Sequence, residues 1–216
     1  LQIDMITSEP LHFYNRMAIG RLIYGRAGMD GLQLIPDNWY ARNRVEVWRN
    51  SIARSVDRQN KTVLLATGES LPYDKLILAT GAHCTTPDPD FLSFDNAFVL
   101  RSAEDAQALR QHVQLRRARR ALVIGGGVLG VEAADALHHL GLHVTLLQRS
   151  DRLMNTQLDH QGAARLTAYL EGIGIQVLTE VNVSRWEGQG EWLRAAWLAH
   201  GPCARADVFV ACLGIS

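Results

Sequence analysis

A glycine-rich segment between an apolar run and a helix-like run constrains the fold of this chain more than any other feature. Residues 121–124 are apolar, Gly125-Gly126-Gly127-Val128-Leu129-Gly130 follows, and helical character continues as far as Leu140. In such a segment the first glycine permits a tight turn, the second lets the backbone approach a ligand, and the third lets the helix pack on its strand. The order predicts a strand, a turn and a helix whose N-terminal amides bind a pyrophosphate.

The residues after this segment continue the alternation of strands and helices. The predicted elements are a strand at 142–147, a helix at 158–172, a strand at 175–178, a β-hairpin at 181–186 and 191–198, and a buried strand at 207–212. A strand one helix after the glycines favours nucleotide binding over the alternative, a glycine-rich turn in an ordinary α/β unit. We therefore predict an α/β fold with a Rossmann-like parallel sheet flanked by helices, plus a β-hairpin.

The first part of the chain is richer in strands. We expect strands at 2–7, 45–48, 51–56, 61–66 and 75–79, a helix at 14–24, and a helical turn at 37–42 with Asp37 as its N-cap. Two prolines within 85–90 interrupt both helix and strand. Ser102 then reads as the N-cap of a helix at 103–113. We divide the chain near residue 98, into domains 1–98 and 99–216.

The composition excludes several classes of protein. The 216 residues contain 22 Lys and Arg and 22 Asp and Glu, so no net field favours nucleic acid or an anionic membrane. The basic run at 116–120 reads as a solvated turn, with a partner or phosphate patch as the alternative. No apolar stretch reaches the roughly 18–20 residues of a membrane span, and no signal peptide is recognisable.

The three cysteines do not form a close pair. Cys84, Cys203 and Cys212 are far apart in the sequence, and no C-x-x-C is present. This spacing favours free thiols over a metal site or a redox disulfide, and it indicates a reducing, cytoplasmic setting.

Several segments together resemble one family. The segment Tyr73-Asp74-Lys75-Leu76-Ile77-Leu78-Ala79-Thr80-Gly81, the entry segment beginning at Arg101-Ser102, residues 125–132 and residues 211–215 are similar to flavoproteins with two dinucleotide-binding domains, the FAD-dependent pyridine nucleotide-disulfide oxidoreductases. Glu9-Pro10, Tyr14-Asn15-Arg16 and the block 153–159 resemble the branch with the nitrite reductase [NAD(P)H] large subunit and rubredoxin reductases.

The resemblance implies the domains, cofactors and partners. Residues 1–98 would be a partial FAD-binding domain, without its N-terminal G-x-G-x-x-G and its C-terminal Gly-Asp segment, and residues 99–216 an NAD(P)H-binding domain. The chain would thus be part of a longer protein, homodimeric in its parent, and would hold FAD poorly and NAD(P) weakly by itself. Hydride would pass from NAD(P)H to FAD, and electrons onward to an iron–sulfur or siroheme centre, rubredoxin or ferredoxin. The cofactors carry this chemistry, so we expect no catalytic acid, base or nucleophile from the side chains and no metal ligands.

The expected cofactor-binding residues are of two kinds. Those for the pyridine nucleotide are Gly125, Gly126, Gly127, Val128, Leu129, Gly130, Glu132, Gln148, Arg149 and Gly214; those for the flavin are Glu9, Arg16, Arg21, Thr80 and Gly81. Three assignments have structural alternatives. Glu132 lies near the flavin–nicotinamide junction in the resembling family, or is a helix-dipole partner; Glu9 binds the FAD ribose or is a solvated loop acid; Thr80-Gly81 approaches FAD or is an ordinary turn.

The sequence leaves the coenzyme and the electron acceptor open. An acid at the end of the strand 142–147 would bind the 2′-hydroxyl of NAD, but this chain has Gln148-Arg149 there. The charge favours NADPH, while the branch resemblance allows NADH. The main functional hypothesis is a nitrite-reductase-type flavoprotein, with a rubredoxin or ferredoxin reductase as the alternative. A non-catalytic nucleotide-binding module without flavin is the alternative from another class.

Overall fold

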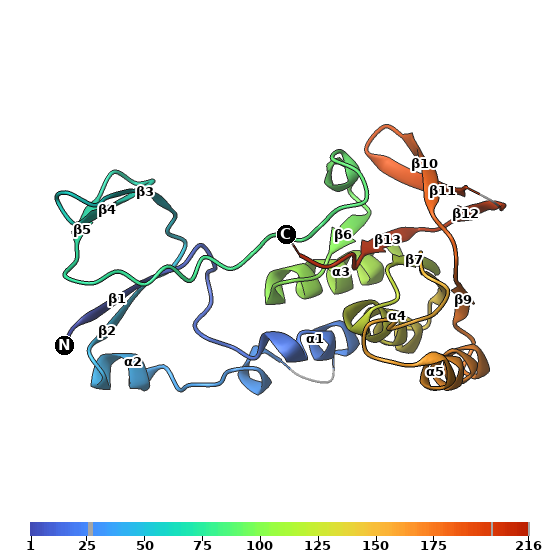
Figure 1. The fold of residues 1–216 in the computed structure, drawn as a ribbon, viewed down its shortest axis with the longest axis horizontal. Coiled ribbons are helices and arrows are strands. Elements are labelled where there is room, and N and C mark those ends of the chain that lie inside the picture. Colours follow the sequence, from blue (N-terminus) through green and yellow to red (C-terminus); the bar gives the residue numbers. More distant parts are fainter. Residues whose placement is uncertain (26–27, 200, 216) are drawn as a thin grey trace. The chain divides into compact units, whose positions relative to one another are not determined.

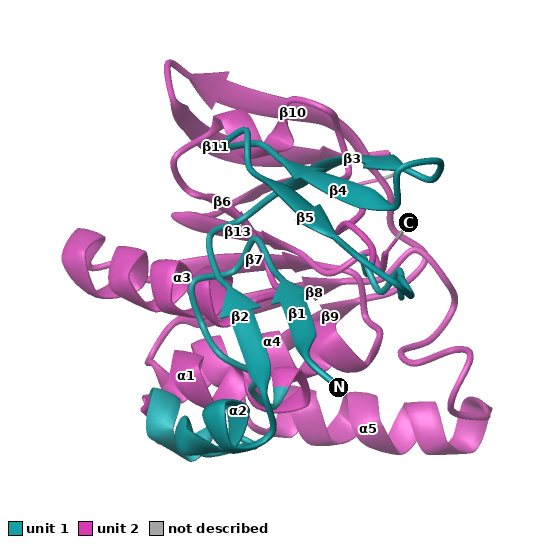
Figure 2. Ribbon diagram, turned by 90° about the vertical axis from the view of Figure 1, so that its left-hand side faces the viewer, with its two compact units in different colours: residues 1–15, 29–81 teal, residues 16–28, 82–216 magenta. Residues whose placement is uncertain are grey.

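The chain folds into two units, one built on a five-stranded parallel sheet with its helices and the other smaller and β-rich. The computed structural model describes residues 1–25, 28–199 and 201–215. The chain divides into unit 1, Leu1–Asn15 with Met29–Gly81, and unit 2, Arg16–Gly28 with Ala82–Ser216 (Figures 1 and 2). His200 and Ser216, which fall in the expected domain 99–216, lie outside the described residues.

Unit 2 is built on a parallel sheet with the strand order β6-β13-β7-β8-β9. Its strands are β6 (Ala97–Val99), β7 (Arg120–Ile124), β8 (His143–Leu147), β9 (Gln176–Leu178) and β13 (Val208–Ala211). From β7, the next strands along the chain, β8 and β9, are added on one side of β7. Strand β13 pairs with β7 on its other side. The strand order therefore reverses at β7, which is where α/β sheets open a crevice for ligands.

A smaller antiparallel sheet belongs to the same unit. It consists of β10 (Val183–Gln189), β11 (Trp192–Leu198) and β12 (Cys203–Arg205). The predicted hairpin is confirmed, but β10 extends to Gln189 and the chain reverses at Gly190, which has a positive φ of 58°. Strand β10 runs further towards the turn than predicted because Glu187 and Gly188 still pair with β11 despite a register shift between them.

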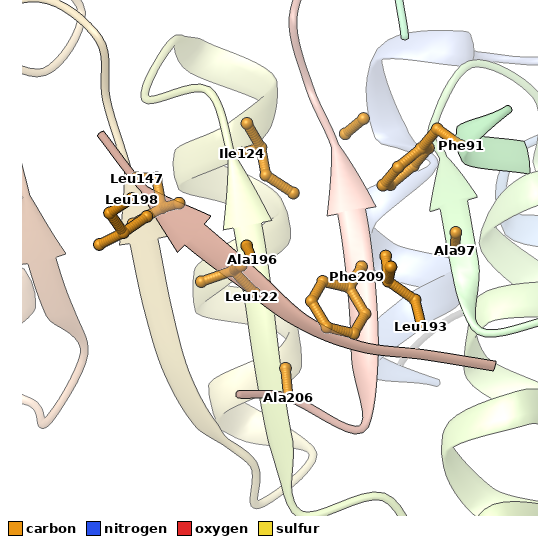
Figure 3. Close-up of a cluster of buried hydrophobic side chains, with 11 residues drawn as sticks. Phe91, Ala97, Leu122, Ile124, Leu147, Leu193, Ala196, Leu198, Ala206 and Phe209 are labelled. Carbon is orange, nitrogen blue, oxygen red and sulfur yellow. The ribbon is translucent and has the colours of Figure 1, made fainter. Parts of the chain in front are cut away.

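The core of unit 2 lies where the two sheets meet. Leu122 and Ile124 of β7 and Phe209 of β13 pack with Leu193 and Leu198 of β11, as Figure 3 shows. The intervening residues of β7 and β13 are buried as well, so both strands are covered on both faces. Burial on both faces explains why these segments are continuous apolar runs rather than alternating ones.

Helices cover the parallel sheet on the face away from β11. They are α3 (Ala103–Arg116), α4 (Val128–His139) and α5 (His160–Gly172), and the short α1 (Gly20–Tyr24), preceded by the 3₁₀ turn η1 (Arg16–Ala18), packs against α3 and α4. The 3₁₀ turn η3 (Phe91–Ser93) lies on the side of β11, because its Phe91 packs in the core with Leu193. Two long helices carry N-caps: the Ser102 hydroxyl accepts the Asp105 amide at 3.1 Å, and Asp159 accepts the Gly162 amide at 2.7 Å. The predicted N-cap at Ser102 is therefore confirmed.

Unit 1 contains a parallel pair of strands and a three-stranded antiparallel sheet. Its elements are β1 (Ile3–Ile6), β2 (Val45–Trp48), β3 (Ala53–Asp57), β4 (Thr62–Leu65), β5 (Ser70–Pro72), the 3₁₀ turn η2 (Met29–Gly31) and α2 (Asn38–Arg42). Strand β1 pairs with β2, and β4 lies between β3 and β5. Val63 and Leu65 are the buried side chains of β4, so this strand alternates between a buried and a more exposed face.

Three local predictions for the first part of the chain are wrong. The run 75–79 is not a strand, and Ile77 and Leu78 are 88% and 73% exposed, since no strand among the described residues pairs with it. The α-helix predicted from Tyr14 begins only at Gly20. Asp37 does not cap α2: it has helical backbone angles, and its carboxylate instead hydrogen-bonds with His12 at 2.7 Å and Gln33 at 2.8 Å.

The α/β class itself is confirmed, with a parallel sheet and antiparallel sheets. None of the helices in the described ranges combines the length and the apolar character that crossing a lipid bilayer demands.

Candidate nucleotide-binding site

The carboxyl ends of three neighbouring strands bring the main predicted residues together. Strand β7 ends in the glycine turn (residues 125–130), β8 ends at Gln148-Arg149, and β13 leads through Cys212 to Gly214. Because β7 lies between β8 and β13, these three loops share one edge of the sheet. Gly125–Gly130, Gln148, Arg149 and Gly214, all predicted to bind the pyridine nucleotide, therefore follow neighbouring strand ends.

Two glycines of the turn are required by packing. Gly125 has a φ of 109°, and a side chain there would collide with the Cys212 carbonyl of β13's extension. A side chain on Gly130 would collide with the Gly125 carbonyl, so the first turn of α4 lies directly on the end of β7. The predicted roles of Gly125 in the tight turn and of Gly130 in close helix packing are confirmed.

The middle of the turn is different, because Gly127 faces open space. A Cβ atom at Gly127 would meet no other atom within 4 Å, and its φ of −78° suits any residue. Gly127 is the N-cap of α4, and no side chain caps that helix. The first amides of a helix have no intrahelical acceptor, so those of Val128 and Leu129 are available to an anion. These open amides, beside a position that packing does not require to be glycine, fit a dinucleotide pyrophosphate.

Gln148 supports the turn from the end of β8. It is 9% exposed, its Oε1 accepts the Gly126 amide at 3.0 Å, and its Nε2 donates to the Arg152 carbonyl at 3.3 Å. A side chain on Gly126 would press against the Gln148 Cβ, 3.0 Å away, and against Leu153. Both Gly126 and Gln148 are therefore packed into the floor of the turn. Arg149, the next residue, is exposed.

The block 153–159 has a structural part that the sequence did not reveal. The Met154 amide donates to the Gly126 carbonyl at 2.7 Å, and Met154 itself has a φ of 47°. Leu153 is fully buried against the turn. The sequence of this block resembles one branch of flavoproteins, but no periodicity in it indicates that it packs against the glycine turn.

Gly214 follows β13, and Glu132 follows the glycine turn within α4. Gly214 has a φ of 94°, is exposed, and accepts the Thr85 amide at 3.0 Å through its carbonyl. Glu132 lies in the second turn of α4 and keeps an exposed side chain, although partial burial of its carboxyl raises its pKa. No cationic partner is among the causes of this shift, so desolvation alone opposes ionisation of Glu132.

The residues predicted to bind the flavin are divided between the two units. In unit 1, Glu9 accepts the Tyr14 hydroxyl at 2.7 Å, and Thr80 and Gly81 are exposed, with a φ of 72° at Gly81. In unit 2, Arg16 donates to the Arg101 carbonyl at 2.9 Å and Arg21 is exposed on α1. Unit 1 thus contains Glu9, Thr80 and Gly81, and unit 2 contains Arg16 and Arg21.

The three cysteines are free. Cys212 is buried beside the glycine turn, and burial raises the pKa of its thiol to about 12, with a smaller contribution from the charge of Cys84. Burial also raises the pKa of Cys84. Both thiols are therefore poor nucleophiles at neutral pH.

Comparison with known proteins identifies the family. The family model "Pyridine nucleotide-disulphide oxidoreductase" matches residues 2–216. The chain belongs to the pyridine nucleotide-disulphide oxidoreductase family. This is a family of enzymes that couple NAD(P)H to a flavin, as the resemblance of the sequence motifs implied.

Curated relatives in the pyridine nucleotide-disulphide oxidoreductase family share about the same identity with the chain. It is 30% identical over 213 residues to the ferredoxin–NAD(+) reductase component of the biphenyl dioxygenase system of Paraburkholderia xenovorans (strain LB400), covering 99% of the chain and 52% of that protein. It is 30% identical over 214 residues to the NADH nitrite reductase large subunit of Escherichia coli (strain K12), and the match covers 99% of the chain and 25% of that subunit. It is 30% identical over 194 residues to the NADH-rubredoxin oxidoreductase of Clostridium acetobutylicum, and the match covers 90% of the chain and 49% of that protein.

Solved structures agree with this membership. The putidaredoxin reductase–putidaredoxin complex matches with a TM-score of 0.90 and 25% identity, covering 99% of the chain and 52% of that protein. The chain therefore spans at most about half the length of these relatives.

Proposed function

We propose that the chain forms the NAD(P)H-binding domain (residues 99–216) and part of the FAD-binding domain (residues 1–98) of a flavoprotein reductase. The observation that carries this proposal is the open N-terminus of α4 at Gly127, where β7, β8 and β13 end together. When bound, the nicotinamide coenzyme and FAD supply the hydride-transfer chemistry. The protein binds and orients them.

Each site residue then has a defined task. The amides of Val128 and Leu129 bind the coenzyme pyrophosphate, and Gly127 lets it approach the backbone. Glu132 and Gly214 line the approach towards the flavin. For FAD, Glu9 binds the adenosine ribose, Thr80 and Gly81 bring backbone near the flavin, and Arg16 and Arg21 supply positive charge.

Electrons leave the flavin without a thiol relay in this proposal. The raised pKa of Cys212 and of Cys84 keeps both thiols protonated, whereas disulfide exchange needs a thiolate. We propose an iron–sulfur or siroheme centre, as in a nitrite reductase large subunit, as the acceptor in a cytoplasmic, homodimeric parent. A rubredoxin- or ferredoxin-type protein is the second candidate, supported by relatives of equal identity with those names.

Two glycine substitutions, one as the test and one as its control, separate coenzyme binding from stability. Gly127→Ala should leave the melting temperature unchanged, because the added methyl meets no atom. It should weaken NAD(P)H binding about tenfold or more, the scale of losing a hydrogen bond to a charged group. Gly130→Ala is the matched control and should lower stability by about 1–3 kcal/mol through overpacking against Gly125.

The readouts are thermal unfolding and calorimetric titration with NADH and NADPH. Wild-type binding of both coenzymes by folded Gly127→Ala would contradict the assignment of the pyrophosphate to this turn. For the flavin, the full-length parent should be yellow, with the absorbance near about 450 nm that flavin cofactors give. A colourless, folded parent that still binds NAD(P)H would instead indicate the non-catalytic module.

A further inference from the structure

We propose that this site selects NADPH over NADH, with Arg149 as the residue that binds the 2′-phosphate. The inference rests on the proposed function and specifies its coenzyme. In dinucleotide-binding folds, the residue at the end of the second strand of the βαβ unit contacts the adenosine ribose: an acid accepts the 2′-hydroxyl, or a nearby arginine binds the 2′-phosphate. Here that strand is β8, and the residues at its end are Gln148 and Arg149.

Gln148 is occupied within the protein. Its Oε1 accepts the Gly126 amide at 3.0 Å and its Nε2 donates to the Arg152 carbonyl at 3.3 Å. With 9% of its surface exposed, the side chain cannot turn towards a ligand without breaking both bonds and opening the floor of the turn. Gln148 is therefore a positioning residue that fixes Gly126, and it offers the ribose no carboxylate that would repel a phosphate.

The nearest acid in the sequence is also neutralised. Asp151 receives two hydrogen bonds from the Arg152 guanidinium, at 3.0 and 3.3 Å, and His160 lies 3.8 Å from it. The same guanidinium donates to the carbonyls of Asn155 at 3.1 Å and Leu158 at 3.4 Å. Arg152 thus holds the loop after β8 and compensates the charge of Asp151, so neither residue is available to a 2′-group.

Arg149 alone in this segment keeps its charge available. It is exposed, and within residues 1–25, 28–199 and 201–215 no side chain is paired with its guanidinium. A guanidinium forms bidentate, charge-assisted hydrogen bonds with a phosphate. The positive end of α4 lies at the neighbouring strand end, so the local field favours the additional negative charge of NADPH.

Calorimetric titration of the full chain with NADPH, NADH, 2′,5′-ADP and 5′-AMP tests the assignment. Wild type should bind NADPH at least about tenfold more tightly than NADH, the scale of one charge-assisted contact, and 2′,5′-ADP more tightly than 5′-AMP by a similar factor. Arg149→Ala should remove most of this preference and leave NADH binding within about twofold. Arg149→Lys should keep part of the preference that Arg149→Ala loses, because lysine keeps the positive charge but cannot form the bidentate hydrogen bonds of a guanidinium.

Arg194→Ala is the control, since it removes an exposed arginine of β11. It should leave both coenzymes unaffected. Equal affinity of the wild type for NADPH and NADH, or an equal loss of both in Arg149→Ala, would overturn the inference. Folded wild type that binds neither coenzyme would instead refute the proposed function, so the two failures are distinct.

Discussion

The partly buried imidazole of His112 on α3 shows how one residue can make the fold sensitive to pH. Its ring lies 5.1 Å from Phe98 and 5.7 Å from Trp192, and its Nε2 has no hydrogen-bond partner in the described part of the chain. Burial lowers the pKa of His112, the charge of Arg116 lowers it further, and Asp95 opposes the shift. Folding therefore favours the neutral form of His112 relative to the unfolded chain.

The sign of the resulting pH dependence follows from linkage. The unfolded chain takes up a proton on His112 near pH 6.5, whereas the folded chain does so only at lower pH. The free energy of unfolding should therefore fall as the pH falls below about 6.5, until the lowered pKa is reached. Melting curves from pH 8 to 5 should show this loss, and His112→Leu should reduce it. His143→Leu, which removes an exposed imidazole, is the control. Identical pH slopes for wild type and His112→Leu would contradict this account.

At the scale of the elements, the long helices of unit 2 differ in how they begin. Helix α3 has a complete capping box, in which the Asp105 carboxylate accepts the amides of Ser102 at 2.8 Å and Arg101 at 2.9 Å. Helix α4 begins at Gly127 with no capping side chain. A capped helix start contributes to stability, whereas an uncapped one leaves its amides to a ligand.

Removing the cap of α3 should cost stability and nothing else. We expect Ser102→Ala to lower the free energy of unfolding by about 1 kcal/mol, the usual effect of losing a serine N-cap. Gln107→Ala, at an exposed position within the same helix, should change it little. Denaturant unfolding of the three proteins checks this. A Ser102→Ala midpoint equal to that of wild type would show that the cap contributes nothing.

At the scale of the whole molecule, one buried amide joins the two sheets of unit 2. Asn96 is 1% exposed; its Oδ1 accepts the Leu193 amide at 2.8 Å, and its Nδ2 donates to the carbonyls of Leu193 at 2.8 Å and Asp207 at 3.0 Å. The side chain thus links β11 to the residue before β13. Nothing in the sequence around Asn96 singled it out, because its partners are about 100 residues away.

The loss of this amide should loosen unit 2 strongly. Asn96→Ala would leave buried backbone groups of Leu193 without partners, and we expect a cost of about 3 kcal/mol or more. Asn182→Ala removes an exposed amide from the same unit and should cost little. Thermal unfolding and hydrogen exchange at β11 measure the difference. Equal stability of the two variants would show that the sheets are held by apolar packing alone.

The sequence predicted the glycine turn and the strand after its helix better than it predicted other elements, for a physical reason. Residues 125–130 and 142–147 carry their own local signals, a glycine turn and an apolar run, and they fold as predicted. Strand β6, in contrast, is three residues long and exists because β13 pairs with it. The run 75–79 has strand-like composition but lacks a pairing partner among the described residues. Elements defined by distant partners were therefore the ones missed.

The contrast between Gly130 and Arg149 has a consequence for how such a chain can change over generations. Gly130 is locked against Gly125, so an exchange there disturbs the scaffold itself. Arg149 follows the end of β8 and its side chain is exposed. Evolution could therefore change the coenzyme that such a protein uses through single substitutions at the exposed position 149, while the fold stays the same.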